Sequence, residues 1–157
     1  VLFPDNDERA IFFFFCVVET VKKLNWVPDI IHVHGWMAAL LPVYMKYFYK
    51  DEALFANTKI VTSVYGQSFD GNLDMELMNK VSFDGIPADA IKDLETPNYE
   101  NIIKASVLHS DAVIVASEAL SPSLTKFIES SKKPFLPFAS KDKFAEAYTD
   151  FYKKMLL

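Results

Sequence analysis

Two histidines, His32 and His34, stand two positions apart in the apolar segment Ile30-Ile31-His32-Val33-His34. Side chains two apart on a β-strand share a face, so this pair could chelate a metal ion and serve a metal-dependent hydrolase. A third ligand is needed, and the side chains able to supply one show no recognised spacing; they are His109, Asp70, Asp74 and Asp111. We therefore predict no metal site. We expect His32 to be a core histidine bonded to backbone, and His34 to lie at the mouth of its strand.

Other kinds of catalytic site find little support. The sequence contains no Gly-x-Ser-x-Gly motif, and its single cysteine, Cys16, has no plausible histidine partner for nucleophilic catalysis. The four glycines do not have the spacing of a phosphate-binding loop, and no carboxylate pair stands out among 21 acidic residues. The residues alone thus support no complete active site, and we predict no cofactor.

The elements that would position these residues alternate between strands and helices. Apolar or β-branched segments predict strands at residues 30–34, 59–65, 112–116 and 135–138. Amphipathic or apolar segments predict helices at residues 7–24, 37–49, 99–109, 120–130 and 142–156, with two short helices within residues 67–97. This order predicts a three-layer α/β fold with a mostly parallel sheet. Ligands of such sheets bind beyond the carboxyl ends of the strands, here at His34-Gly35-Trp36, Tyr65-Gly66-Gln67 and Ser117-Glu118.

Size and composition narrow the class of protein. A chain of 157 residues, 51% hydrophobic, fits one domain with its own core, spanning residues 1–157. The net charge is −5 and Arg9 is the only arginine, so we expect no nucleic-acid partner. The apolar run 10–18 is too short to span a bilayer, and its acidic flank does not suit a signal peptide. We expect a cytoplasmic protein with no membrane partner, from which a segment preceding Val1 is missing.

The two ends of the chain carry apolar helical patterns. The apolar residues of the segment 7–24 cover more than one stripe, so we expect this helix to be covered on both sides, with Cys16 buried and inert. The segment 139–157 places five large side chains at helical spacing: Phe144, Tyr148, Phe151, Tyr152 and Met155. We expect this stripe to pack on the domain. Binding of a protein partner is the alternative interpretation.

Three motifs, in order across about residues 5–125, resemble bacterial glycogen synthases and plant starch synthases. An acidic, asparagine and arginine cluster opens a phenylalanine-rich helix at Asp5-Asn6-Asp7-Glu8-Arg9-Ala10-Ile11-Phe12-Phe13. A strand with tryptophan, proline, aspartate and histidines follows, and it runs on into Ala39-Leu40-Leu41-Pro42. Asn101-Ile102-Ile103-Lys104-Ala105 and Ser110-Asp111-Ala112-Val113-Ile114-Val115-Ala116-Ser117 are similar to the helix and strand that close the family's first domain.

The resemblance implies a glycosyltransferase-B architecture, in which two Rossmann-like domains face a cleft. Such enzymes transfer glucose from ADP- or UDP-glucose to an α-1,4-glucan with retention of configuration. This chain would be the later part of the N-terminal domain, which meets the acceptor glucan or maltooligosaccharide. His34, Trp36, Tyr65 and Gly66 would then be the substrate-binding residues. The nucleotide-sugar-binding domain would be missing or separate, and the family's early lysine and glycine loop is absent.

The chain departs from the family pattern at the cleft itself. Gly35 stands where the family usually carries aspartate, and Met37 replaces a histidine that meets the transferred sugar. A thioether cannot donate a hydrogen bond to a sugar hydroxyl. Tyr65-Gly66 replaces a histidine and asparagine pair. We therefore assign no catalytic residue and expect a domain that is not catalytically competent alone; the alternatives are a non-catalytic carbohydrate-binding domain, a protein-interaction domain or, remotely, a metal-dependent hydrolase.

Overall fold

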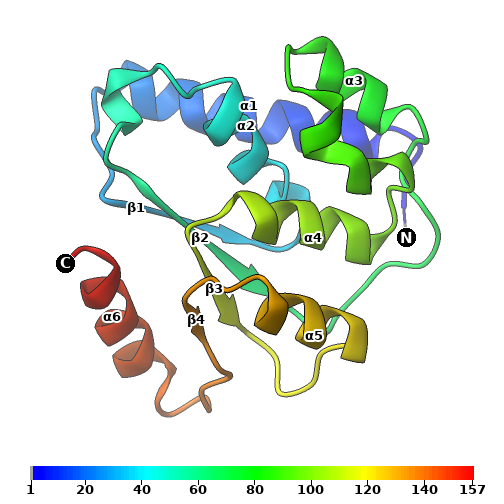
Figure 1. Ribbon diagram of the computed structural model, residues 1–157. Coiled ribbons are helices and arrows are strands. Elements are labelled where there is room, and N and C mark those ends of the chain that lie inside the picture. Colours follow the sequence, from blue (N-terminus) through cyan, green and yellow to red (C-terminus); the bar gives the residue numbers. More distant parts are fainter. Residues whose placement is uncertain (1) are drawn as a thin grey trace.

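The computed structural model describes residues 2–157 and contains a four-stranded, fully parallel sheet (Figure 1). Its strands follow one another in space as they do in sequence: β1 (Ile30–His34), β2 (Lys59–Val64), β3 (Ala112–Val115) and β4 (Phe135–Leu136). In the register of the first pair, His34 lies opposite Ser63. The predicted parallel α/β fold is confirmed.

The helices that connect the strands lie on one face of the sheet. Each right-handed crossover advances the chain by one strand in the same direction, which puts every connecting helix on the same side. These helices are α2 (Leu41–Tyr47), α3 (Leu77–Phe83), α4 (Tyr99–His109) and α5 (Pro122–Ser130), with short 3₁₀ helices at Trp36–Ala38, Ala53–Phe55 and Ala88–Glu95. The main core forms here, between these helices and alternate strand residues such as Ile60 and Val64.

Helix α1 (Asn6–Lys23) packs on this core along one stripe only. Ala10, Phe14 and Val18 recur every four residues and are buried, as one face of an α-helix requires. The opposite face is exposed, including Phe12, which is 71% exposed, and Cys16. Our expectations that this helix is covered on both sides and that Cys16 is buried were therefore wrong, because a helix at the outside of the domain meets the core with one face.

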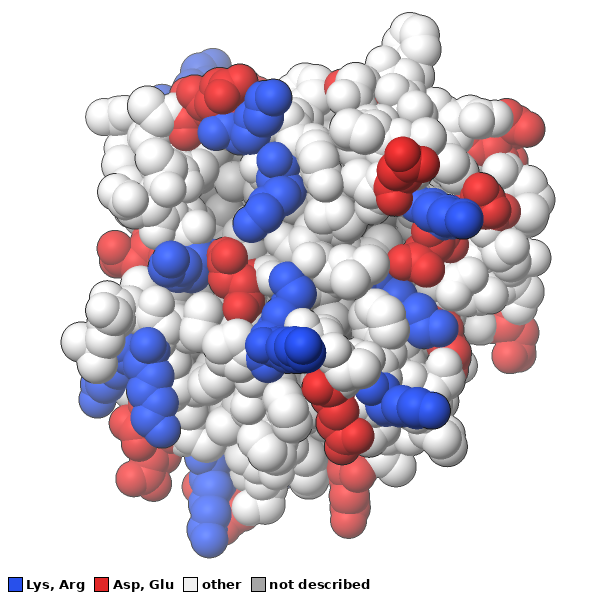
Figure 2. Space-filling model, viewed as in Figure 1, with Lys and Arg blue, Asp and Glu red and all other residues white. Residues whose placement is uncertain are grey.

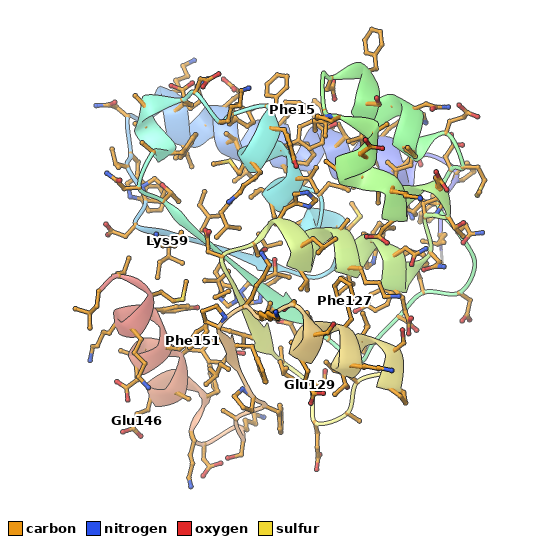
Figure 3. The ribbon with its side chains drawn as sticks, viewed as in Figure 1. Phe15, Lys59, Phe127, Glu129, Glu146 and Phe151 are labelled. Carbon is orange, nitrogen blue, oxygen red and sulfur yellow. The ribbon has the colours of Figure 1, made fainter. Side chains whose placement is uncertain are left out.

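The second face of the sheet is covered by α6 (Phe144–Met155). Four side chains of its apolar stripe, Tyr148, Phe151, Tyr152 and Met155, pack against a small cluster of strand residues, Val61, Ala112 and Ile114. Figure 3 shows Phe151 directed from α6 toward the sheet, while Glu146 points away from it. The two faces of the sheet are thus unequally covered, by several helices on one side and one on the other.

The helix predicted at residues 37–49 is divided. A 3₁₀ turn at Trp36–Ala38 precedes α2, and Pro42 is the second residue of α2. Proline fits the first turn of a helix because its missing N–H has no partner there, so Pro42 starts the helix rather than bending a longer one. The boundaries of α4 agree with the prediction. Among residues 2–157, no helix is long and apolar enough to cross a membrane.

Candidate functional site

A cavity of about 390 Å³ opens at the carboxyl ends of β1 and β2. It is lined by His34, Gly35, Trp36, Tyr65, Gln67, Ser68 and Tyr99. Three of the four residues predicted to bind substrate meet in it. The fourth, Gly66, lines an adjoining cavity of about 330 Å³ that shares Tyr65, Ser68 and Tyr99. Met37 is not among the lining residues of either cavity.

Gly35 turns the chain from β1 into the 3₁₀ helix that carries Trp36. Its backbone has φ 72° and ψ 167°, a combination essentially confined to glycine. A Cβ added at this position would meet no atom within 4 Å, so the requirement for glycine comes from the backbone alone. Beyond the turn, the Trp36 ring packs edge-on against Phe69, with ring centroids 5.2 Å apart. Gly35, which stands where the family resemblance implies an aspartate, is therefore the residue that this turn needs.

Tyr65 lines both cavities, and two hydrogen bonds hold it in place. Its hydroxyl lies 2.8 Å from Nδ1 of His34, and its carbonyl oxygen accepts a hydrogen bond of 2.8 Å from the hydroxyl of the buried Tyr99. Burial lowers the pKa of His34, so its ring is neutral at pH 7. One nitrogen of the neutral ring thus pairs with Tyr65, and the neutral ring can donate one hydrogen bond and accept one.

His32 is part of the support behind the site. Its Nε2 lies 2.7 Å from Oγ of Ser63 and its Nδ1 2.5 Å from the hydroxyl of Tyr152 in α6. Its ring centroid is 3.9 Å from that of His34. Burial, and secondly repulsion from His34 once that ring is protonated at low pH, lower the pKa of His32 to about 4. The expectation of backbone partners was wrong, because the facing residues of β2 and α6 supply hydroxyl groups instead.

The proposed third metal ligands do not gather around this histidine pair. His109 lies in α4 and its Nδ1 is 2.8 Å from the carbonyl oxygen of Ala105, while Asp111 accepts a hydrogen bond from the Ile60 N–H. Asp70 lines the adjoining cavity, and Asp74 pairs with Lys80. Within residues 2–157, no group of three or more histidine, cysteine or acidic residues could hold a metal ion.

The adjoining cavity depends on a close approach between the loops after β2 and β3. The N–H of Gly66 donates a hydrogen bond of 2.8 Å to Oγ of Ser117, and a Cβ on Gly66 would collide with the carbonyl oxygen of Ala119. Ser121 donates a hydrogen bond of 2.5 Å to Glu100, and this bond is the main cause of the lowered pKa of that carboxyl. A charged carboxylate therefore faces this cavity.

Sequence reasoning missed Tyr99, Ser68 and Phe69. Ser68 and Phe69 follow a predicted strand, so their place beyond its carboxyl end was the available signal. Tyr99 begins α4, and its hydroxyl reaches back across 34 residues to Tyr65. Only the packing of α4 on the sheet reveals that contact.

Comparisons with known proteins show which protein family this chain resembles. A family model described as the starch synthase catalytic domain matches residues 1–128. The glycogen synthase of Thermotoga maritima is 35% identical over 116 residues, which are 73% of this chain and 23% of that protein. For the glycogen synthase of Elusimicrobium minutum, identity is 33% over 132 residues, 82% of this chain and 26% of that protein. No solved structure matches.

The chain thus spans about a quarter of the length of the curated relatives that it matches. The matched segment contains β1, β2 and β3, and with them every residue that lines the cavity at His34 and Trp36. Its parallel α/β sheet agrees with the Rossmann-like N-terminal domain that the family resemblance implied. The chain belongs to the starch and glycogen synthase family.

Proposed function

We propose that this chain binds α-1,4-glucan at the carboxyl edge of its sheet and does not transfer glucose by itself. The observation that carries the proposal is the cavity at His34, Trp36 and Tyr65, which lies within the family-matched segment at the edge where parallel sheets bind ligands. In this proposal the cavity is the acceptor side of a glucosyl-transfer site.

The lining of the cavity suits a sugar. Trp36 and Tyr65 offer aromatic surface against which the C–H groups of a pyranose ring can pack. His34, Gln67 and Ser68 add groups that exchange hydrogen bonds with hydroxyls. Such a combination of apolar walls and few polar groups is typical of small-ligand sites.

The same lining does not suit a sugar nucleotide. Of the described residues 2–157, none that lines this cavity or the adjoining one is a lysine or arginine, and the second cavity carries Asp70 and Glu100. Glucosyl transfer leaves a nucleoside diphosphate whose growing negative charge must be stabilised. The donor, ADP- or UDP-glucose, would therefore be held by a nucleotide-sugar-binding domain outside this chain.

The residues needed for the alternative functions make structural contacts instead. The aromatic stripe proposed for a protein partner is turned toward the sheet through Tyr148 and Tyr152. The ring nitrogens of His32, needed for a metal hydrolase, already face Ser63 and Tyr152. We also propose a cytoplasmic location, which fits the exposed free thiol of Cys16.

The test combines binding with turnover. Isothermal titration calorimetry with maltoheptaose should show saturable binding that Trp36→Ala weakens about tenfold, since removing an aromatic platform forfeits roughly 1–1.5 kcal/mol. The matched control is Phe83→Ala, because Phe83 is 91% exposed in α3 and lines neither cavity. Absence of saturable binding would refute glucan recognition. Release of ADP or UDP from a glucosyl nucleotide in the presence of maltoheptaose would refute the non-catalytic part.

A further inference from the structure

A third cavity, of about 270 Å³, lies beyond the ends of β2 and β3 and shares Tyr65 with the cavity at His34 and Trp36. Tyr65 and Ala116 form its sheet side, and the remaining walls are Phe138, Ala139, Lys141, Phe144 and Tyr148. These five residues belong to the connection after β4 and to α6, beyond the family-matched residues 1–128. The cavity is therefore built largely by the part of the chain that the family model does not cover.

We propose that this third cavity is a second sugar subsite, so that a linear α-glucan bound at Trp36 continues across Tyr65 toward Phe144. This inference rests on the proposed function. It adds that the glucan must be several sugar units long, and it names the residues that bind the added units. A glucan of several residues is the ligand that can occupy both cavities, because Tyr65 lines each of them.

The chemistry of the walls favours a sugar over a purely apolar ligand. Phe138 and Phe144 are 43% and 47% exposed, so their rings present apolar surface to the cavity. Lys141, which lines the same cavity, adds an amine that can donate hydrogen bonds. Burial raises the pKa of Tyr148, so its side chain is neutral at neutral pH and adds no charge to this wall.

The walls are held in place before any ligand binds. The Tyr148 ring packs edge-on against Phe144 at 5.7 Å and lies 5.9 Å from the ring of His32. Helix α6 is fixed to the sheet by its apolar stripe and by the contact between Tyr152 and His32. A preformed site loses little side-chain entropy on binding.

Continuity with the first cavity comes from Tyr65, which lines both. Its hydroxyl is held by His34 and its carbonyl oxygen by Tyr99, so this shared wall is fixed in place. A ligand made of repeated sugar units can place one unit in each cavity. This arrangement predicts that affinity depends on the length of the glucan.

The experiment compares maltotriose with maltoheptaose by calorimetry on the full chain. We expect maltoheptaose to bind about tenfold more tightly than maltotriose, because one further aromatic subsite contributes on the order of 1 kcal/mol. Phe144→Ala should bring the affinity for maltoheptaose down to that for maltotriose. Phe83→Ala, on the distant helix α3, should leave the tenfold difference intact.

Each outcome decides a different point. If neither oligosaccharide binds the wild-type chain, the proposed function is refuted. If both bind with equal affinity, or if Phe144→Ala keeps the advantage of the longer ligand, the second subsite is refuted while glucan binding stands. Should Phe144→Ala fail to fold, as judged by circular dichroism, Phe138→Ala removes another wall ring outside α6 and must show the same loss of length dependence.

Discussion

Lowering the pH from 7 to 4.5 is expected to destabilise the fold through His32. The pKa of this side chain is lowered from 6.5 to about 4 in the folded protein. Between these two values the unfolded chain binds a proton that the folded chain does not, so the free energy of unfolding falls as the pH falls through this window. Above about pH 6.5 the histidine is neutral in both states and the stabilisation is complete.

The size of the effect follows from the same shift. A pKa difference of this size corresponds to about 3 kcal/mol at full development. Because the ring is only partly buried, solvent screening reduces our expectation to about 2 kcal/mol, nearly all of it lost by pH 4.5. Both neighbouring hydroxyls, on Ser63 and Tyr152, can accept a hydrogen bond from the charged ring, which limits the loss further.

Urea unfolding at pH 7.0, 5.5 and 4.5 measures this loss. His34 and His109 also have lowered pKa values, so the wild-type profile alone would mix three groups. His32→Gln removes one titration, and the difference between wild type and variant isolates it. We expect that difference to shrink by about 2 kcal/mol from pH 7.0 to 4.5. A difference that stays constant with pH, or an NMR titration of His32 with its midpoint near 6.5, would refute the reasoning.

Three further substitutions probe the backbone and the buried charge. Gly35→Asp should lower the free energy of unfolding by about 1–3 kcal/mol, because its φ of 72° with ψ of 167° strains any other residue; unchanged urea stability would contradict this. Gly66→Ala should cost about 2 kcal/mol by pushing the new Cβ against the Ala119 carbonyl, and a crystal structure should show that loop displaced. Lys80→Met should lower the free energy of unfolding by about 2 kcal/mol, because the fully buried carboxylate of Asp7 loses its partner at 2.7 Å. Thermal unfolding of Lys80→Met, compared with that of Asp7→Asn, measures this loss. Equal stability of Lys80→Met and wild type would refute the pairing.

The parallel sheet could be predicted from the sequence because its strands have clear runs of apolar and β-branched residues. Segments 59–65 and 112–116 are rich in β-branched residues, and the structure has β2 and β3 there. Helix α4 was also predictable, since Asn98 caps it and its side chain accepts a hydrogen bond from the Asn101 N–H. In each case local propensity and tertiary packing favour the same structure.

The exposure of helix faces and the partners of buried side chains could not be predicted from the sequence, because they depend on tertiary packing. The periodicity of α1 is compatible with one or two covered faces, and only the position of the helix at the outside of the domain leaves Phe12 and Cys16 exposed. The contact between Tyr152 and His32 spans 120 residues, so no local pattern indicates it. That contact also explains why His32 has side-chain partners rather than the backbone partners expected of a core histidine.

Gly35 and Met37 are the two positions after β1 where the family resemblance implies other residues, and the structure makes different demands on them. Met37 does not line the cavity at His34 and Trp36, so its replacement of the histidine that the resemblance implies leaves the walls of that cavity unchanged. Gly35 cannot be exchanged for aspartate without cost, because the turn after β1 has adopted a conformation that glycine permits. The orientation of Trp36, which packs on Phe69 beyond the turn, depends on the same backbone. The turn at Gly35 and the aromatic pair beyond it thus belong to one local structure, and this is the aromatic surface to which we propose that sugar rings bind.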